Sequence, residues 1–183
     1  MFWWLLTDMI RLLRNVIVCA VFAVVSPVAS LAAGTGGCES FAWPLKTEIE
    51  WMQAADSQPA ASGATLSAPP AKAISLALLP SESVKFALAP TGKPKGDAAK
   101  TFGGLVTFEG VPAAGLYQVS LSGPGWIDVI QDGKALETVA HTGKSDCEGL
   151  RKSLRFNIGA GPFVVQLNGV QSESVKLAVR AAN

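Results

Sequence analysis

The chain has 183 residues, enough for one domain, with 15 basic residues, 14 acidic residues and a single histidine. This balanced charge, without a run of Lys or Arg, gives no electrostatic basis for nucleic-acid binding. A catalytic zinc needs three protein ligands and a facial iron triad needs two histidines, so a chain with one histidine and with both of its mature cysteines oxidised can build neither site conventionally. We therefore expect neither a cofactor nor a metal.

Residues 1–32 have the layout of a secretory signal peptide, for which Met9 is a better start than Met1. Two arginines precede an apolar run over residues 16–25, and small residues suit cleavage after Ala32. The alternative is an N-terminal membrane anchor, but the stretch of about 18 residues is shorter than the roughly 20 that a spanning helix needs. We expect a periplasmic or secreted protein with no stable membrane span, carrying 13 basic and 13 acidic residues after cleavage.

The cysteines predict one disulfide. Cys19 falls within the predicted signal peptide, which leaves Cys38 and Cys147. In an oxidising compartment, two remaining cysteines predict a Cys38–Cys147 bond. This bond would close a loop of about 110 residues and contribute up to ~4.7 kcal/mol on the chain-entropy model.

Residues 33–72 are predicted to form an N-terminal segment that consists of a helix and a linker. Residues 44–55 have a helical pattern that begins with Pro44, and Thr47 with Glu50 offers an alternative capping box one turn later. The helix has a narrow apolar stripe at Leu45, Ile49 and Met52. The residues that follow, 56–72, are rich in Ala, Ser and Pro and predict a linker.

Residues 73–183 are predicted to form a β-sandwich domain, because the hydrophobic period changes to two. Asp132 and Gly133 predict a tight turn before a strand over residues 134–140. The other eight runs have apolar positions at Ile74, Leu76, Leu78; Val84, Phe86, Leu88; Phe102, Val106, Phe108; Tyr117, Val119, Leu121; Ile127, Val129; Leu154, Phe156, Ile158; Phe163, Val165, Leu167; and Val175, Leu177, Val179. The pattern predicts a mainly β, antiparallel sandwich of eight or nine strands with one short N-terminal helix.

A catalytic site is not evident in the sequence. His141, Ser145 and Asp146 lie in one short stretch, which rarely provides the geometry of a catalytic triad. We interpret this stretch as a solvated loop that leads to the disulfide. An enzyme would need a cleft that collects Asp128, Glu109 or His141 from separate strands, so we do not expect catalysis.

The aromatic residues are the remaining candidates for a ligand-binding site. Trp126 shares strand parity with Asp128, opposite the apolar face of its strand. An outward Trp beside polar groups can stack on a sugar ring or a partner's side chain. The alternative is that Trp126 covers the sandwich edge or packs against the docked helix. Trp43 and Phe41 are weaker candidates of the same kind, which we expect to wedge the N-terminal segment onto the sheet.

Two resemblances involve longer stretches. "AGLYQVSLSGPGWIDVIQDGKAL" and "RKSLRFNIGAGPFVVQLNGVQSESVKLAVR" resemble the jelly-roll sandwiches of bacterial pre-peptidase C-terminal domains over residues 73–181. That resemblance implies a role in export or polymer binding. The combination "CESFAWPL", "GWIDVIQDG", "DCEGLRKSLRF" and "PFVVQLNGV" is similar to a group of short exported proteins of alphaproteobacteria. Some of these carry a homogentisate dioxygenase name, which a single histidine does not support; the similarity implies a compartment and no mechanism.

These observations predict a non-catalytic exported protein of the cell envelope. Its aromatic surface around Trp126 would bind envelope polysaccharide or another polymer. An alternative is a structural or interaction role, in which a strand edge or the helix engages a periplasmic protein. A third is an enzyme of unknown type.

Overall fold

The computed structural model describes residues 36–92 and 98–182. The predicted signal peptide, with Cys19, lies outside the described residues. The described chain contains two β-sheets, one α-helix and three 3-10 turns, η1 (Gly36–Ser40), η2 (Ser81–Ser83) and η3 (Ala98–Lys100). None of the helices within the described ranges has the length and apolar character needed to cross a membrane.

Sheet A has six strands in the order β1–β3–β12–β6–β10–β9. Their bounds are β1 (Gln58–Ala61), β3 (Ile74–Ala77), β12 (Ser174–Ala181), β6 (Gly115–Leu121), β10 (Lys152–Ile158) and β9 (Ala140–Gly143). The pair β1–β3 is parallel and all other neighbours are antiparallel. The strand β9 is therefore an end strand, paired on one side with β10.

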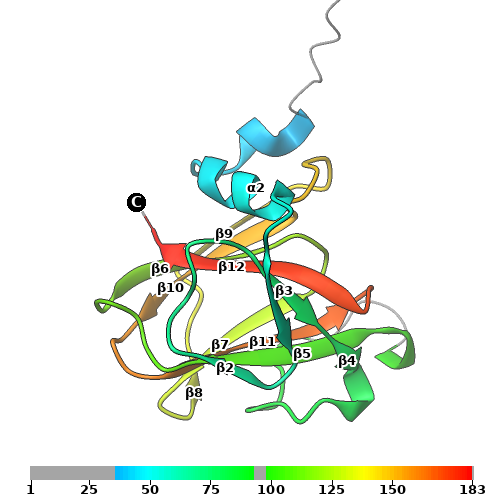
Figure 1. The fold of residues 1–183 in the computed structure, drawn as a ribbon, viewed down its shortest axis with the longest axis vertical. Helices are drawn as coiled ribbons and strands as arrows, with labels where there is room; N and C mark the ends of the chain where they lie inside the picture. The colour runs from blue at the N-terminus through cyan, green and yellow to red at the C-terminus, as the bar shows by residue number, and fades with distance from the viewer. Residues whose placement is uncertain (1–35, 93–97, 183) are drawn as a thin grey trace, which may run out of the picture. The chain divides into compact units, whose positions relative to one another are not determined.

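Sheet B also has six strands, with the main order β2–β5–β11–β7–β8 and β4 paired to β5. Their bounds are β2 (Ala64–Leu66), β4 (Leu79–Pro80), β5 (Phe102–Phe108), β7 (Trp126–Gln131), β8 (Lys134–Ala135) and β11 (Phe163–Val170). The pair β2–β5 is parallel. The two sheets lie as separate layers, with sheet A between sheet B and the helix (Figure 1).

The prediction of a mainly β fold with one short N-terminal helix is confirmed. The sandwich has twelve strands instead of eight or nine, and its sheets are mixed instead of purely antiparallel. The stretch 56–72 is not a linker, because it contributes β1 and β2 to opposite sheets.

The strand predicted around Phe86 is wrong. After η2 the chain runs without a strand through residues 84–92. The backbone N–H of Ala87 donates to Gln166 Oε1 at 3.2 Å, and Gln166 Nε2 donates to the Leu88 carbonyl at 3.0 Å. The segment therefore lies over the outer face of sheet B, held by a side chain of β11 instead of by strand pairing.

The core lies between the sheets and contains nearly all the predicted inward positions. Apart from Phe102 and Leu154, which are half-buried, the predicted apolar positions of β3, β5, β6, β7, β10, β11 and β12 are buried in one cluster. Phe108 and Phe163 stack with ring centroids 4.9 Å apart. The period of two thus identifies the inner faces of both sheets correctly, because alternate side chains of a strand point to opposite faces.

The predicted tight turn joins β7 and β8. Asp132 has a φ of 53° and Gly133 a φ of 70°. Two consecutive positive φ values are typical of the type I′ turn that Asp-Gly favours between antiparallel strands. The hairpin therefore follows directly from this dipeptide.

The helix α2 spans Lys46–Gln53, shorter than the predicted 44–55. Its N-cap is Leu45, which makes no side-chain capping bond, so the capping box at Thr47 and Glu50 does not define its start. The helix lies on the outer face of sheet A, against β12 (Figure 1). A second apolar cluster fills this interface, formed by Phe41, Leu45, Met52, Ala73, Cys147, Leu150 and Ala178.

The predicted disulfide is present. Cys38 and Cys147 are joined with an S–S distance of 2.04 Å across a sequence separation of 109 residues. Both sulfurs belong to the second apolar cluster or pack against it. The bond ties the segment before α2 to the connection between β9 and β10, and it indicates a non-cytoplasmic compartment.

Polar contacts from β12 hold α2 along its length. Glu48 is fully buried, and its Oε1 accepts hydrogen bonds from Arg180 at 3.2 Å and from Gln118 of β6. At the other end of the helix, Lys176 Nζ donates to the carbonyls of Met52 and Ala54 at 2.6 and 2.8 Å. The last carbonyls of a helix have no partner within it, so an ammonium group there stabilises its end.

Candidate functional site

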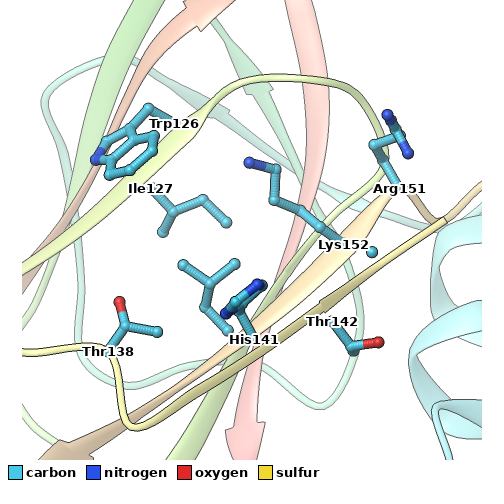
Figure 2. Close-up of a pocket in the computed structure, with 9 residues that line it drawn as sticks. Trp126, Ile127, Thr138, His141, Thr142, Arg151 and Lys152 are labelled. Atoms are coloured by element: carbon cyan, nitrogen blue, oxygen red, sulfur yellow. The ribbon is translucent and has the colours of Figure 1, made fainter. Parts of the chain in front are cut away.

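A cleft of about 720 Å³ opens between the two sheets at one edge of the sandwich. It lies between β9 and β10 of sheet A and the beginning of β7 of sheet B (Figure 2). Ile127 and Leu154 supply apolar lining and Thr138 supplies a hydroxyl group, whereas the Thr142 hydroxyl accepts a hydrogen bond from the backbone N–H of Ala42. We refer to this space as the edge cleft.

The register of β9 and β10 explains which side chains enter the edge cleft. His141 is paired with Leu154, and Gly143 with Lys152. These residues share the face of sheet A that carries the core residue Phe156. Lys152 thus stands opposite a glycine that also lines the cleft.

The edge cleft is basic. His141, Arg151 and Lys152 line it, and the described lining residues include no Asp or Glu. In Figure 2 the Lys152 side chain extends toward Trp126 and Ile127, and Arg151 lies beyond it. Arg151 forms no ion pair with any residue of the described ranges. The cleft therefore combines positive charge with a partly apolar wall.

Trp126 stands at the border of the edge cleft in a fixed orientation. Its indole Nε1 donates to Asp128 Oδ1 and to Thr91 Oγ1, both at 2.9 Å. Gly92 packs against the ring so closely that an added Cβ would lie 2.0 Å from an indole carbon. Even so, Trp126 is 43% exposed. Its N–H and part of its surface are committed to the protein, and the rest of the ring is open to solvent.

Asp128 is the centre of the network that holds Trp126. The residue is 5% exposed, and its Oδ2 accepts from the Thr91 N–H at 3.2 Å and from Gln166 Nε2 at 3.3 Å. Its Oδ1 accepts from the Thr91 hydroxyl as well as from Trp126. All these donors are neutral and belong to β7, β11 or the segment 84–92. Asp128 therefore positions Trp126 and anchors that segment, and its carboxylate does not face the cleft.

We expect Asp128→Ala to lower the free energy of unfolding by about 2 kcal/mol, because hydrogen bonds to a charged group contribute roughly 1.5–3 kcal/mol. It should also release the indole of Trp126. Urea denaturation measures the first effect, and ¹⁹F NMR of 5-fluorotryptophan protein measures the second, with the resonance assigned by Trp126→Phe. Glu109→Ala, which removes an exposed carboxylate, should change neither value appreciably. An unshifted, sharp Trp126 resonance in Asp128→Ala would contradict the positioning role.

Phe41 and Trp43 are not part of this site. Phe41 is buried in the second apolar cluster, and Trp43 packs against it. The Trp43 ring lies under the guanidinium of Arg155, 4.2 Å from the ring centroid, on the outer face of sheet A. The structure thus brings Trp126 and Asp128 together on sheet B. Phe41 and Trp43 instead help to pack the N-terminal segment against sheet A, as the sequence predicts.

The residues proposed for an enzyme do not converge. The edge cleft contains His141 but neither Asp128 nor Glu109. His141 belongs to the strand β9, so the interpretation of its stretch as a loop is wrong at that residue. No group of three metal-ligating side chains gathers within the ranges that the structure describes.

Sequence reasoning identified Trp126 but missed the basic residues of the edge cleft. Lys152 has the same strand parity as Leu154 and Phe156, and a lysine at a core-facing position of a strand is the signal that was available. The parity of Lys152 alone did not predict a place in the cleft, because a lysine at the start of a strand usually lies in solvent. Comparison with models of protein families, with curated proteins and with solved structures gives no match for this chain.

Proposed function

We propose that this protein is a non-catalytic, exported module of the cell envelope that binds glycan through Trp126 and the edge cleft. The observation that carries the proposal is the fixed, half-exposed indole at the border of an open cleft. A sugar ring presents an apolar face that packs on an indole, and its hydroxyl groups suit a lining of Thr, His, Arg and Lys.

Preorganisation supports this role. Asp128 and Thr91 fix the indole edge, and Gly92 supports the ring. A side chain that is already ordered loses little conformational entropy when a ligand binds. A tryptophan that served only as sandwich covering would not need two hydrogen bonds and a glycine contact while remaining 43% exposed.

The compartment is the second part of the proposal. The disulfide is consistent with the oxidising periplasm or cell exterior, where envelope polysaccharide is found. The predicted cleavage after Ala32 would release the domain there. Envelope polysaccharide is therefore the ligand class to test first.

Trp126→Ala is expected to weaken retention on isolated peptidoglycan or envelope polysaccharide at least about tenfold, since buried aromatic anchors dominate binding. Pull-down with oxidised protein measures it, and a thermal melt verifies the fold of each variant. Val139→Ala is the matched control, because Val139 is another exposed apolar residue, 54% exposed, that does not line the edge cleft.

The alternative role as a protein-interaction module predicts a different result. The end strand β9 has one side that pairs with no described strand, which suits strand addition by a partner. A protein of this kind would tolerate Trp126→Ala and would not be retained on glycan. If the wild type is not retained on glycan, or if the wild type and Trp126→Ala are retained equally, glycan binding through Trp126 is ruled out.

A further inference from the structure

We infer that the ligand of the edge cleft is an N-acetylated sugar chain, in which an acetamido group replaces a ring hydroxyl; this inference rests on the proposed function. The observation that carries it is the apolar lining beside Trp126, which consists of Ile127 and Leu154. A sugar that carried only hydroxyl groups would place some of them against these side chains without a hydrogen-bond partner, at a cost in free energy. An acetamido group instead brings a methyl group to the apolar lining.

Trp126 offers the ligand one face of its ring and no free donor. Its N–H donates to Asp128 and Thr91, neither of which lines the edge cleft. A Cβ atom added to Gly92 would overlap a ring-fusion carbon of the indole, and such a carbon is approached only from above or below the ring plane. Gly92 therefore covers one face of the ring. The other face is apolar, so the polar contacts of the ligand come from the rest of the cleft.

His141 and Thr138 are the polar side chains that can make these contacts. Both residues are exposed, and neither side chain has a hydrogen-bond partner among the residues that the structure describes. His141 is paired with Leu154 across β9 and β10, so a polar and an apolar side chain lie next to each other in the cleft wall. Figure 2 shows His141 and Ile127 around the same space. An acetamido group matches this arrangement, because its amide donates and accepts hydrogen bonds next to its methyl group.

The volume of the edge cleft suits a short stretch of sugar chain. Clefts of about 300–1,000 Å³ hold ligands of drug size, so a cleft of about 720 Å³ has room for about two or three sugar rings. One ring stacks on the open face of Trp126. The methyl group of an acetamido substituent packs on Ile127 and Leu154, and its amide binds His141 or Thr138.

The test compares two trisaccharides of the same ring configuration and linkage. The first is the β-1,4-linked trimer of N-acetylglucosamine, and the second is the β-1,4-linked trimer of glucose, which has a hydroxyl in place of each acetamido group. Calorimetry measures the binding of each to the oxidised protein. We expect the wild type to bind the N-acetylated trimer at least about tenfold more tightly, because a buried methyl group and a hydrogen bond are gained together.

Variants of the lining locate the preference. Thr138→Ala with His141→Ala removes the two polar side chains and should reduce the preference about threefold to tenfold. Leu154→Ala removes part of the apolar lining and should also reduce it. The matched control is Thr65→Ala with Val139→Ala, which changes exposed residues outside the cleft and should preserve it. Thermal melts verify the fold of each variant, and the first variant keeps the test valid if Leu154→Ala folds poorly, because it changes exposed residues alone.

Each outcome separates the inference from the proposed function. Equal binding of the two trimers, or tighter binding of the glucose trimer, would overturn the inference, and loss of that binding in Trp126→Ala would leave glycan binding intact. A preference that survives both lining variants would overturn the assignment of the acetamido group to this cleft. If neither trimer binds while envelope polysaccharide still retains the protein, the inference alone is overturned. If the polysaccharide does not retain the protein either, both proposals are overturned.

Discussion

Replacing Cys38 and Cys147 with serine is expected to lower the free energy of unfolding by about 4–5 kcal/mol. The bond spans 109 residues of sequence. The conformational entropy that the unfolded chain regains when a cross-link is removed increases with the length of the closed loop, so the effect here is large. Domains of this size are stable by only about 5–15 kcal/mol, so the loss is a large share of the total. The segment before α2 should also lose its attachment to the β9–β10 connection.

Urea denaturation of the double variant and the wild type under oxidising conditions measures this loss. The matched control is Glu39→Ala, which changes an exposed residue beside Cys38, keeps the disulfide and should not change the midpoint. Adding reductant to the wild type should reproduce the effect of the double variant. A loss below about 1 kcal/mol would show that the second apolar cluster holds the N-terminal segment without the bond.

Glu48→Ala is expected to lower the free energy of unfolding by about 3 kcal/mol, the second large effect. Glu48 is fully buried, and its carboxylate accepts hydrogen bonds from Arg180 and Gln118. The Ala variant removes a buried acidic partner of Arg180, and breaking a buried ion pair is more destabilising than the pair itself is stabilising. The Arg180 side chain is 21% exposed, so water offsets part of the effect.

Glu50→Ala is the matched control on the same helix. Glu50 forms an i,i+4 pair with Lys46 at 3.9 Å, and both side chains are largely exposed. Such pairs contribute only about 0.3–0.5 kcal/mol. Glu48→Gln keeps an acceptor for Gln118 and Arg180. Its loss of unfolding free energy should therefore lie between those of Glu48→Ala and Glu50→Ala. Chemical denaturation of the three variants checks this order, and equal effects of Glu48→Ala and Glu50→Ala would contradict it.

The inner faces of the sandwich were predictable because burial leaves a period of two in the sequence. Val119 and Leu121, or Val165 and Leu167, alternate with residues that face outward, and each pair lies in the core. The disulfide followed from counting the cysteines of a chain that is predicted to be exported, and the β7–β8 hairpin followed from Asp132 and Gly133. These features depend on local pattern or on simple chemistry.

The missed strands depend on partners far away in sequence. The strand β1 consists of Gln, Pro and two Ala, which have weak or unfavourable strand propensity, and it forms because β3 offers a parallel edge. Among the strands that the structure describes, β9 pairs with β10 alone. Conversely, the alternation of apolar and polar residues around Phe86 does not mark a strand. Every second side chain of this segment is half-buried against sheet B, but the segment does not pair with a strand of that sheet.

The site was predictable only in part for the same reason. The parity of Trp126 and Asp128 placed both on one face, and the structure confirms that they are in contact. The edge cleft is lined by residues of β7, β9 and β10, and no local sequence pattern indicates that these strands meet around an open space. Glu48 was not identifiable as buried, because a glutamate on an amphipathic helix normally faces solvent.

The position of β12 has a consequence for the order in which the molecule assembles. This strand lies between β3 and β6, so sheet A is divided into two unconnected parts until β12 is in place. A chain that emerges with its N-terminus first must keep both flanking strands unpaired on that side while later residues are still being delivered. Most native pairing in sheet A is therefore long-range, and folding of this kind is slow compared with the formation of local hairpins. Because β12 carries Lys176, the cation that binds the last carbonyls of α2 reaches them only when this strand is in place.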